Sequence, residues 1–332
     1  MRLLMLGGTA FVGRAVVDDA LARGWDVTVL NRGTTKPPAG VTALVGDRTT
    51  PEGLDTLKTG EWDIVVDAWS QAPRAVDASA RLLADRAGFY AYVSTRGVYE
   101  WPPPAGADED YPLVDADPTD GDVDYGRAKR GAEIAVTAAF GDRSLLGRAG
   151  LILGPWENVD RLPWWLRRIA KGGPVLAPGP HELALQYIDA RDLAGWTLDQ
   201  AERGNGGAYN LVSPPGFTTM GQLLETCVEV TGSDADLRWT EPERILAAGI
   251  EGWTQLPIWA EPGTSYDALH HADVSKAVAA GLVNRPVEDT VRDTWTWMQG
   301  PDGQMARTVR SATGLDPEIE ATFLKAQPQG PS

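Results

Sequence analysis

The sequence has little of several features that would point to particular classes of protein. It has one cysteine, Cys227, so no disulfide can form within the chain and no C-x-x-C zinc site exists. Its three histidines show no metal-ligand spacing, and we predict no metal. No run of about 18 apolar residues occurs, so we expect no membrane-spanning helix. The apolar run in the N-terminal MRLLMLGG is too short for a signal peptide, and we therefore expect a cytoplasmic protein.

Positive charge is also scarce. Acidic residues outnumber basic ones by 46 to 30, which gives a formal net charge of −16 over the 332 residues. A field of this sign repels phosphate backbones and anionic lipids, so we expect neither nucleic acid nor a membrane surface as a partner. The expected partner is a small molecule, whose phosphate groups a local basic pocket can still bind.

The first half of the sequence alternates short apolar runs with longer amphipathic segments. The apolar runs predict strands at 3–6, 26–30, 42–45, 64–68, 89–94 and 145–152. The amphipathic segments predict helices at 13–23, 74–87 and 125–138. Strands separated by helices are typical of right-handed βαβ units, so the sequence predicts an α/β fold with a Rossmann-type, doubly wound parallel sheet.

After Gly154-Pro155 the pattern becomes irregular, although a short strand is still predicted at 187–189 and helices at 192–202, 220–231 and 287–298. We therefore predict a Rossmann domain at 1–153 and a smaller, irregular domain, mainly substrate-binding, at 154–300. Chain near 185–203 is expected to return to the first domain. Residues 301–332 are expected to form a C-terminal tail with a short helix.

A glycine-rich turn, GGTAFVGR, lies between the first predicted strand and the first predicted helix. At that position backbone N–H groups and the positive end of the helix can face a pyrophosphate. The spacing is G-x-x-G-x-x-G with Ala10 in place of the middle glycine, and a plain strand-to-helix connection is the alternative. The residues of the turn predicted to bind a cofactor are Gly7, Thr9, Ala10, Phe11, Val12, Gly13 and Arg14.

The end of the second strand indicates which nicotinamide cofactor is bound. An acidic residue there would bind the ribose hydroxyls of NAD, whereas the sequence has Asn31-Arg32. Arg32, together with Arg14 and Lys36, is therefore predicted to bind a 2′-phosphate, and NADP(H) is preferred over NAD(H). A solvated surface arginine is the alternative. Asp47 and Arg48 follow the third strand and are further predicted cofactor contacts, although Asp47 could equally be a turn residue.

A tyrosine and a lysine, Tyr125 and Lys129, stand four residues apart at a predicted helix start, which places them on one helix face. A lysine cation stabilises a nearby phenolate and lowers the pKa of the tyrosine, as acid–base catalysis at neutral pH requires. This spacing also occurs by chance in many helices. The interpretation as a catalytic pair is supported by the hydroxyl pair Ser94-Thr95, which ends a predicted strand at the edge where parallel sheets bind ligands.

Four motifs occur in order: GGTAFVGR, VSTRGVY at 93–99, YGRAK at 125–129 and LILGP at 151–155. Together they resemble the extended or atypical short-chain dehydrogenase/reductases, the NAD-dependent epimerase/dehydratase superfamily, with most similarity to actinobacterial reductase-like members. The resemblance implies that Tyr125 is the catalytic acid–base, that Lys129 is its partner and a ribose ligand, and that Thr95 binds the reacting oxygen. It leaves open whether Ser94 shares that role, and it places Trp69 in a stretch that lines the cofactor.

Two departures from the family pattern concern the substrate. Leu151 stands where nucleotide-sugar enzymes have an asparagine, and Leu185-Gln186-Tyr187 lacks the arginine that holds substrate phosphates in those enzymes. We therefore expect an NADP(H)-dependent oxidoreductase acting on a carbonyl, alcohol or imine of a small, largely apolar molecule. A nucleotide-sugar epimerase or dehydratase is the first alternative, and a non-catalytic NADP-sensing regulator is the second.

Two weaker signals concern the substrate pocket and the oligomeric state. Five tryptophans of the second half could form an aromatic pocket, although core packing is the alternative. These residues are Trp156, Trp164, Trp165, Trp253 and Trp259. The small and apolar residues at 131–136, in the helix that starts at Tyr125, could pair two copies in a homodimer, with packing inside the chain as an equal alternative.

Overall fold

The computed structural model describes residues 1–50, 52–305 and 313–326, which form two compact units. Of the predicted tail at 301–332, residues 306–312 and 327–332 lie outside the described residues. Unit 1 consists of Met1–Ile152, Ile188–Ser213 and Ala272–Asn284. Unit 2 consists of Leu153–Tyr187, Pro214–His271 and Arg285–Ser332. The return of chain at Ala272–Asn284 to unit 1 was not expected from the sequence.

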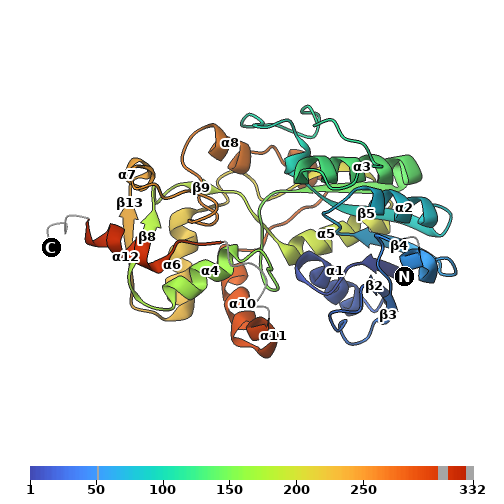
Figure 1. Cartoon of the computed structure of the whole chain (residues 1–332), viewed down its shortest axis with the longest axis horizontal. Helices are drawn as coiled ribbons and strands as arrows, with labels where there is room; N and C mark the ends of the chain where they lie inside the picture. Colours follow the sequence, from blue (N-terminus) through green and yellow to red (C-terminus); the bar gives the residue numbers. More distant parts are fainter. Residues whose placement is uncertain (51, 306–312, 327–332) are drawn as a thin grey trace. The chain divides into compact units, whose positions relative to one another are not determined.

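Unit 1 is built on a seven-stranded sheet in which all neighbouring strands are parallel. Its order is β11-β6-β5-β4-β1-β2-β3, and Figure 1 labels β2, β3, β4 and β5. The strands are β1 (Arg2–Leu6), β2 (Asp26–Asn31), β3 (Thr42–Val45), β4 (Trp62–Asp67), β5 (Ala87–Thr95), β6 (Ser144–Ala149) and β11 (Gly207–Leu211). From β1 the chain adds β2 and β3 on one side and β4, β5 and β6 on the other. The predicted Rossmann-type doubly wound α/β fold is thus confirmed, with its topological switch point beside β1.

Helices cover both faces of this sheet. Alternate residues of β1 point to opposite faces, so Leu3 and Met5 join the core under α1 (Phe11–Ala22) and α5 (Ala190–Arg203). Leu4 and Leu6 join the core under α2 (Arg74–Leu83) and α3 (Tyr125–Phe140) (Figure 1). The shorter helices of unit 1 are η1 (Glu52–Leu57), η2 (Arg96–Val98), η3 (Gly141–Arg143) and α9 (Ser275–Ala279).

The small residues of α3 are used for packing inside the chain. Ala132 and Ala135 lie in the core shared with α2, and a Cβ added at Gly131 would lie 2.8 Å from the carbonyl oxygen of Asp117 and 2.9 Å from Pro73. Of the two alternatives for this segment, packing inside the chain is therefore present in the structure. A homodimer through the remaining surface of α3 stays a prediction.

Unit 2 is a layered set of helices with short strand pairs. β8 (Gly173–Pro178) and β13 (Ala235–Thr240) are parallel, whereas β9 (Ala184–Leu185) and β12 (Thr218–Thr219) are antiparallel. Its helices are α4 (Arg161–Ile169), α6 (Met220–Thr231), α7 (Pro242–Ala247), α8 (Thr264–His270), α10 (Val287–Gln299), α11 (Pro301–Met305) and α12 (Pro317–Lys325). β7 (Ile152–Leu153) and β10 (Ile188–Asp189) lie where the chain passes between units. Within the described ranges, every helix is too short or too polar to span a bilayer.

Candidate active site

The glycine-rich turn between β1 and α1 has a backbone that requires glycine. Gly7 and Gly8 have φ values of +120° and +90°, a region that residues with a Cβ rarely adopt. A Cβ at Gly13 would lie 2.7 Å from the backbone nitrogen of Gly8, so only glycine lets α1 approach the turn this closely. The glycines therefore add no side chains of their own at the start of α1, and this geometry fits a pyrophosphate.

A cavity of about 210 Å³ lies beside this turn at the C-terminal edge of the parallel sheet. Dinucleotides bind at this edge in doubly wound folds. Its lining residues are Leu6, Gly7, Thr9, Leu30, Asn31, Arg32, Thr34, Thr35, Gly46, Asp47, Arg48 and Trp69. The structure thus brings together seven of the predicted cofactor contacts. It does not bring in Arg14 or Lys36, and the Arg14 Nε donates instead to the Asp18 carboxylate at 2.8 Å.

Asp47 is both a turn residue and a lining residue of this cavity. Its carboxylate accepts hydrogen bonds from the hydroxyl and the backbone N–H of Thr49, at 2.7 and 3.0 Å. These bonds, helped by the charge of Arg32, hold the pKa of Asp47 below its ordinary value. The turn role of Asp47 is therefore present in the structure, and its contact with a cofactor stays a prediction.

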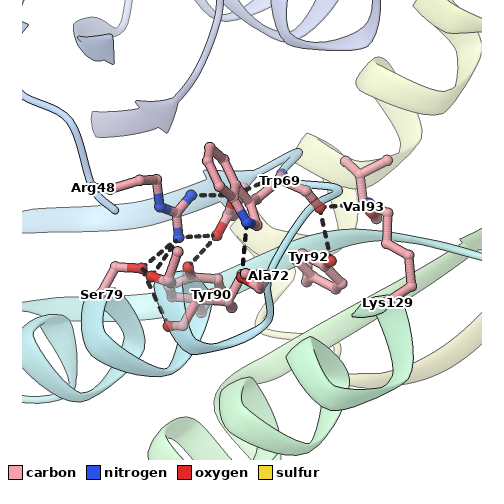
Figure 2. A network of polar contacts seen from close by, with 11 residues as sticks. Arg48, Trp69, Ala72, Ser79, Tyr90, Tyr92, Val93 and Lys129 are labelled. Atoms are coloured by element: carbon pink, nitrogen blue, oxygen red, sulfur yellow. Dashed lines mark hydrogen bonds and ion pairs between the residues drawn. The ribbon is translucent and has the colours of Figure 1, made fainter. Parts of the chain in front are cut away.

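Arg48, by contrast, is directed away from solvent and into a buried ion pair. Its Nη1 and Nη2 atoms each lie 2.7 Å from an oxygen of Asp67, at the end of β4 (Figure 2). The Tyr90 hydroxyl and the backbone N–H of Trp69 donate to the same carboxylate at 2.7 and 2.9 Å. Burial acts to raise the pKa of Asp67, but the Arg48 charge and these bonds hold it below the ordinary value.

Lys129 lies next to this ion pair, and its side chain is only 3% exposed. Its Nζ donates to the carbonyl oxygens of Trp69 and Val93, at 2.7 and 2.6 Å, and lies 4.7 Å from the centre of the Tyr92 ring (Figure 2). Burial lowers the pKa of Lys129 to about 8, although Asp67 and Glu133 act in the opposite direction. The lysine is thus fixed in place and titrates close to neutrality.

Thr95 and Tyr125 lie on either side of Gly97. A Cβ built at Gly97 would lie 3.5 Å from the Thr95 hydroxyl oxygen and 3.8 Å from the Tyr125 ring. The side chain of Asp124 caps α3 by accepting from Arg127 N, and this cap fixes Tyr125 at the first position of the helix. The residue Tyr125 is 54% exposed. Tyr125 is therefore accessible to a ligand, and both its ring and the Thr95 hydroxyl approach Gly97.

The structure separates Ser94 from Thr95. Ser94 is buried, and its hydroxyl donates at 2.7 Å to Glu133 on α3. Arg148 donates to both oxygens of the same carboxylate, at 3.0 and 3.2 Å, and Arg130 donates to one of them. Ser94 is therefore committed to a buried ion-pair network, and the hydroxyl that adjoins Tyr125 is that of Thr95.

The ion-pair networks around Asp67 and Glu133 were missed at the level of sequence. Arg148 also donates to the Tyr99 hydroxyl at 3.2 Å, which in turn donates at 2.7 Å to Asn210 on β11. The signal for such networks was an ionisable side chain inside an otherwise apolar segment, as in Asp67 at the end of WDIVVD and Arg148 within SLLGRA.

The five predicted pocket tryptophans differ in their surroundings within the described part of the chain. Trp165 and Trp259 are fully buried, and their indole N–H groups donate to the carbonyls of Pro257 and Gly179, at 2.7 and 2.9 Å. These two rings offer no surface to a ligand, which corrects the prediction for them. Trp156 packs against Trp297, Trp164 against Trp165, and Trp253 lies under the Arg161 guanidinium.

Unit 2 does contain a cavity of about 380 Å³, but none of those five tryptophans is among its lining residues. Two other tryptophans, Trp295 and Trp297, line it together with ionisable side chains of α4 and of the loops on either side of α4. The ionisable lining residues are Glu157, Asp160, Arg167 and Lys171.

Residues 3–211 match the family described as "NAD dependent epimerase/dehydratase family". No curated protein matches the sequence. The UDP-glucose 4-epimerase of Thermus thermophilus, solved in complex with NAD, is 21% identical; 91% of this chain and 100% of that chain are covered, with a TM-score of 0.62. A putative epimerase from Burkholderia cenocepacia J2315 is 19% identical, with coverage of 92% and 98% and a TM-score of 0.65.

The dTDP-glucose 4,6-dehydratase of Bacillus anthracis str. Ames, solved in complex with NAD, is 14% identical. It covers 91% of this chain and 98% of its own, with a TM-score of 0.64. The TM-scores and the coverage show a shared fold along nearly the whole length of each chain. At identities this low, the comparison with these structures shows the fold alone.

Proposed function

The chain belongs to the NAD-dependent epimerase/dehydratase family, and from this premise we propose that it uses a pyridine nucleotide to change the oxidation state of a hydroxyl-bearing carbon in a nucleotide sugar. The enzyme class is that of the extended short-chain dehydrogenase/reductases. The observation that carries the proposal is the arrangement around Gly97, which both the Thr95 hydroxyl and the Tyr125 ring approach. Lys129 lies one helical turn beyond Tyr125 on the same face of α3.

The residues described above fit a nicotinamide dinucleotide. Gly7, Gly8 and Gly13 would hold the pyrophosphate, and Lys129 would hold the ribose next to the nicotinamide. The bound group supplies a site that accepts or donates a hydride. NADP(H) is the favoured form, because Arg32 lines the cavity at the end of β2, where a neutral asparagine stands in place of an acid.

The chain's own residues supply the proton chemistry. The Tyr125 hydroxyl takes the proton of a substrate alcohol or returns it to a carbonyl oxygen. The Thr95 hydroxyl donates a hydrogen bond to the same oxygen and so fixes its position. The Lys129 ammonium, fixed by the carbonyls of Trp69 and Val93, places a positive charge on the side of α3 where the phenolate forms.

The nucleotide-sugar class is supported by the family and by the names of proteins that share the fold, among them a UDP-glucose 4-epimerase and a dTDP-glucose 4,6-dehydratase. A second candidate is an NADP(H)-dependent reductase of a small apolar carbonyl compound or imine. It is favoured by Leu151 and Leu185, buried apolar residues where nucleotide-sugar enzymes have polar ones.

The test compares the two substrate classes on the cofactor-loaded protein. Calorimetric titration with UDP- and dTDP-sugars should give micromolar affinities, and cofactor-dependent conversion of a bound sugar should follow. Tyr125→Phe should lower turnover by about 10²–10⁴-fold while cofactor affinity stays near that of the wild type.

Absence of nucleotide-sugar binding, together with NADPH oxidation by an apolar carbonyl panel, would replace the first candidate with the second. Cofactor binding without turnover of either panel would favour the NADP-sensing regulator instead.

A further inference from the structure

Trp69 connects the cavity beside the glycine turn with Lys129. Trp69 is one of the lining residues of that cavity. Its backbone carbonyl accepts hydrogen bonds from the Lys129 Nζ at 2.7 Å and from the Tyr92 hydroxyl at 2.8 Å (Figure 2). Whatever fixes Trp69 therefore acts both on the cavity and on Lys129.

Trp69 is fixed at three points. Its backbone N–H donates to Asp67 at 2.9 Å, and its indole N–H donates to the carbonyl of Ala72 at 3.0 Å. The Arg48 guanidinium lies over its ring, 5.2 Å from the centre. The Asp67 bond fixes the backbone of Trp69 immediately before the carbonyl that Lys129 bonds, and the Arg48 contact fixes its ring.

Asp67 and Arg48 are in turn fixed by one another. The carboxylate is 0% exposed and the arginine 7% exposed. Ser79 and the carbonyl of Ala75 accept further hydrogen bonds from the guanidinium. A buried ion pair of this kind adds little stability over well-packed apolar residues, because both charges must be desolvated. The position of this ion pair is better explained by its contacts with Trp69, which it fixes through the Asp67 carboxylate and the Arg48 guanidinium.

We propose that Asp67 and Arg48 are positioning residues of the active site, which orient Trp69 toward Lys129 and whose opposite charges set the pH range over which Lys129 stays charged and binds the cofactor. This inference rests on the proposed function, because it assumes that Lys129 holds the cofactor ribose.

The charged and titratable groups around Lys129 determine the sign of the effect. Asp67 from β4 and Glu133 from α3 stabilise the ammonium, Arg48 from the segment after β3 opposes it, and burial opposes it most strongly. Tyr92 from β5 presents its ring face, and Tyr125 lies one turn earlier on α3. The pKa of Lys129 is lowered to about 8. The ammonium is therefore intact below about pH 8 and is lost above it, so cofactor affinity should fall as the pH rises through that value.

The two positioning residues should move this alkaline fall in opposite directions. Asp67→Asn removes a charge that favours the ammonium, so the midpoint should move about one pH unit lower. Arg48→Met removes a charge that opposes it, so the midpoint should move about one unit higher. The double variant should lie between the two. A residue that only supports the fold would weaken binding at every pH without such opposite shifts.

The experiment measures NADPH affinity by the fluorescence of the nicotinamide, from about pH 6 to about pH 10, a range that spans the lysine titration. Ser79→Ala is the matched control: it removes a neutral partner of Arg48, and its midpoint should equal that of the wild type. Lys129→Met should bind more weakly and show no alkaline fall. If one single variant does not fold, the other single variant and the charge-neutral double variant decide the sign.

Equal midpoints in the wild type and both single variants, or an alkaline fall that persists in Lys129→Met, would overturn the inference while leaving the proposed function intact. A wild-type protein that binds neither NADPH nor NADH at any pH would overturn the proposed function, and this inference with it.

Discussion

Unit 1 and unit 2 each bury a carboxylate, and the two respond to burial in opposite ways. In unit 1, Asp67 faces the Arg48 guanidinium through two hydrogen bonds, and its pKa lies below the ordinary value. In unit 2, Glu157 is almost as inaccessible but accepts bonds from the backbone N–H groups of Arg161 and Leu162, at 2.8 and 3.3 Å. Burial raises the pKa of Glu157 to about 7 against these bonds and the Arg161 charge.

The two pKa values differ because the hydrogen-bond partners of the two carboxylates differ, since burial is common to both groups. A guanidinium that contacts both oxygens keeps Asp67 ionised at any pH near neutrality, and Glu133 in the same unit is paired with Arg148 in the same way. Unit 1 therefore holds Asp67 in one charge state close to Lys129. Unit 2 places an acid that changes charge near neutral pH on the wall of its own cavity.

The largest expected effect comes from removing the guanidinium that pairs with a buried carboxylate. Arg148→Met leaves Glu133 without its principal partner, and the free energy of unfolding should fall by about 3–5 kcal/mol. The matched control is Arg130→Met. Arg130 bonds the same carboxylate, but its side chain is 25% exposed against 4% for Arg148. Its loss should cost about 1 kcal/mol or less. Equal losses in urea denaturation would contradict the partner-based explanation.

The second effect concerns the pH dependence of unfolding. A carboxylate whose pKa is raised from 4.5 to about 7 on folding stabilises the protein fully below about pH 4.5. That contribution is lost as the pH rises through about 7, and the full loss amounts to about 3 kcal/mol. Glu157→Gln keeps an oxygen acceptor for the backbone N–H groups but cannot ionise.

Between pH 5 and about pH 8 the Glu157→Gln variant should therefore gain stability relative to the wild type, measured as the difference in denaturation midpoints at each pH. Asp67→Asn should instead be less stable than the wild type by an amount that stays constant over this range, because the lowered pKa of Asp67 in the folded protein and its ordinary value in the unfolded protein keep the carboxylate ionised in both. If the Glu157→Gln and wild-type midpoints ran parallel across this range, Glu157 would not be the titrating group.

The same contrast explains what the sequence could and could not predict. The parallel sheet follows from apolar runs and the glycine-rich turn, and α6 was predicted with the bounds it has, because these are local patterns. The strand pair β8–β13 and helix α4 were missed. Pro174 and Pro178 lie within β8, and Pro163 lies within α4, so that residues typical of loops obscure both elements.

Of the candidate site, the pair Tyr125 and Lys129 could be predicted from the sequence because the two residues are only four positions apart. The pairing of Arg48 with Asp67 joins segments 19 residues apart and exists only once β3 and β4 occupy the same sheet. The roles of Ser94 and Thr95 could not be separated for a related reason. Adjacent residues of a strand point to opposite sides, and which side faces the site is decided by the packing of the whole sheet.

The third test compares two adjacent hydroxyls. Ser94 is bonded to the buried Glu133–Arg148 ion pair, whereas Thr95 lies near Gly97 with Tyr125. Thr95→Val keeps the shape of the side chain but removes the hydroxyl next to Tyr125, and turnover should fall about a hundredfold. Ser94→Ala removes a hydrogen bond to Glu133, and it should lower stability by about 1–2 kcal/mol while turnover stays close to that of the wild type. Steady-state kinetics and thermal unfolding of both variants check this pair. A larger loss of turnover in Ser94→Ala would reverse the assignment.

The smallest expected effect concerns a pair of charges at the surface, Arg32 and Asp47. Arg32 is exposed and lines the cavity together with a carboxylate that keeps its charge, so water screens its attraction for an added phosphate. An arginine–phosphate pair in this setting should contribute about tenfold in affinity. Arg32→Ala should therefore weaken NADPH binding about tenfold and leave NADH binding unchanged, measured by cofactor fluorescence at low and high salt.

The matched control is Lys36→Ala, which removes a cation that does not line the cavity and should change neither affinity. Equal binding of NADPH and NADH by the wild type would show that the Asp47 charge cancels the arginine, and would remove the basis for an NADP(H) preference.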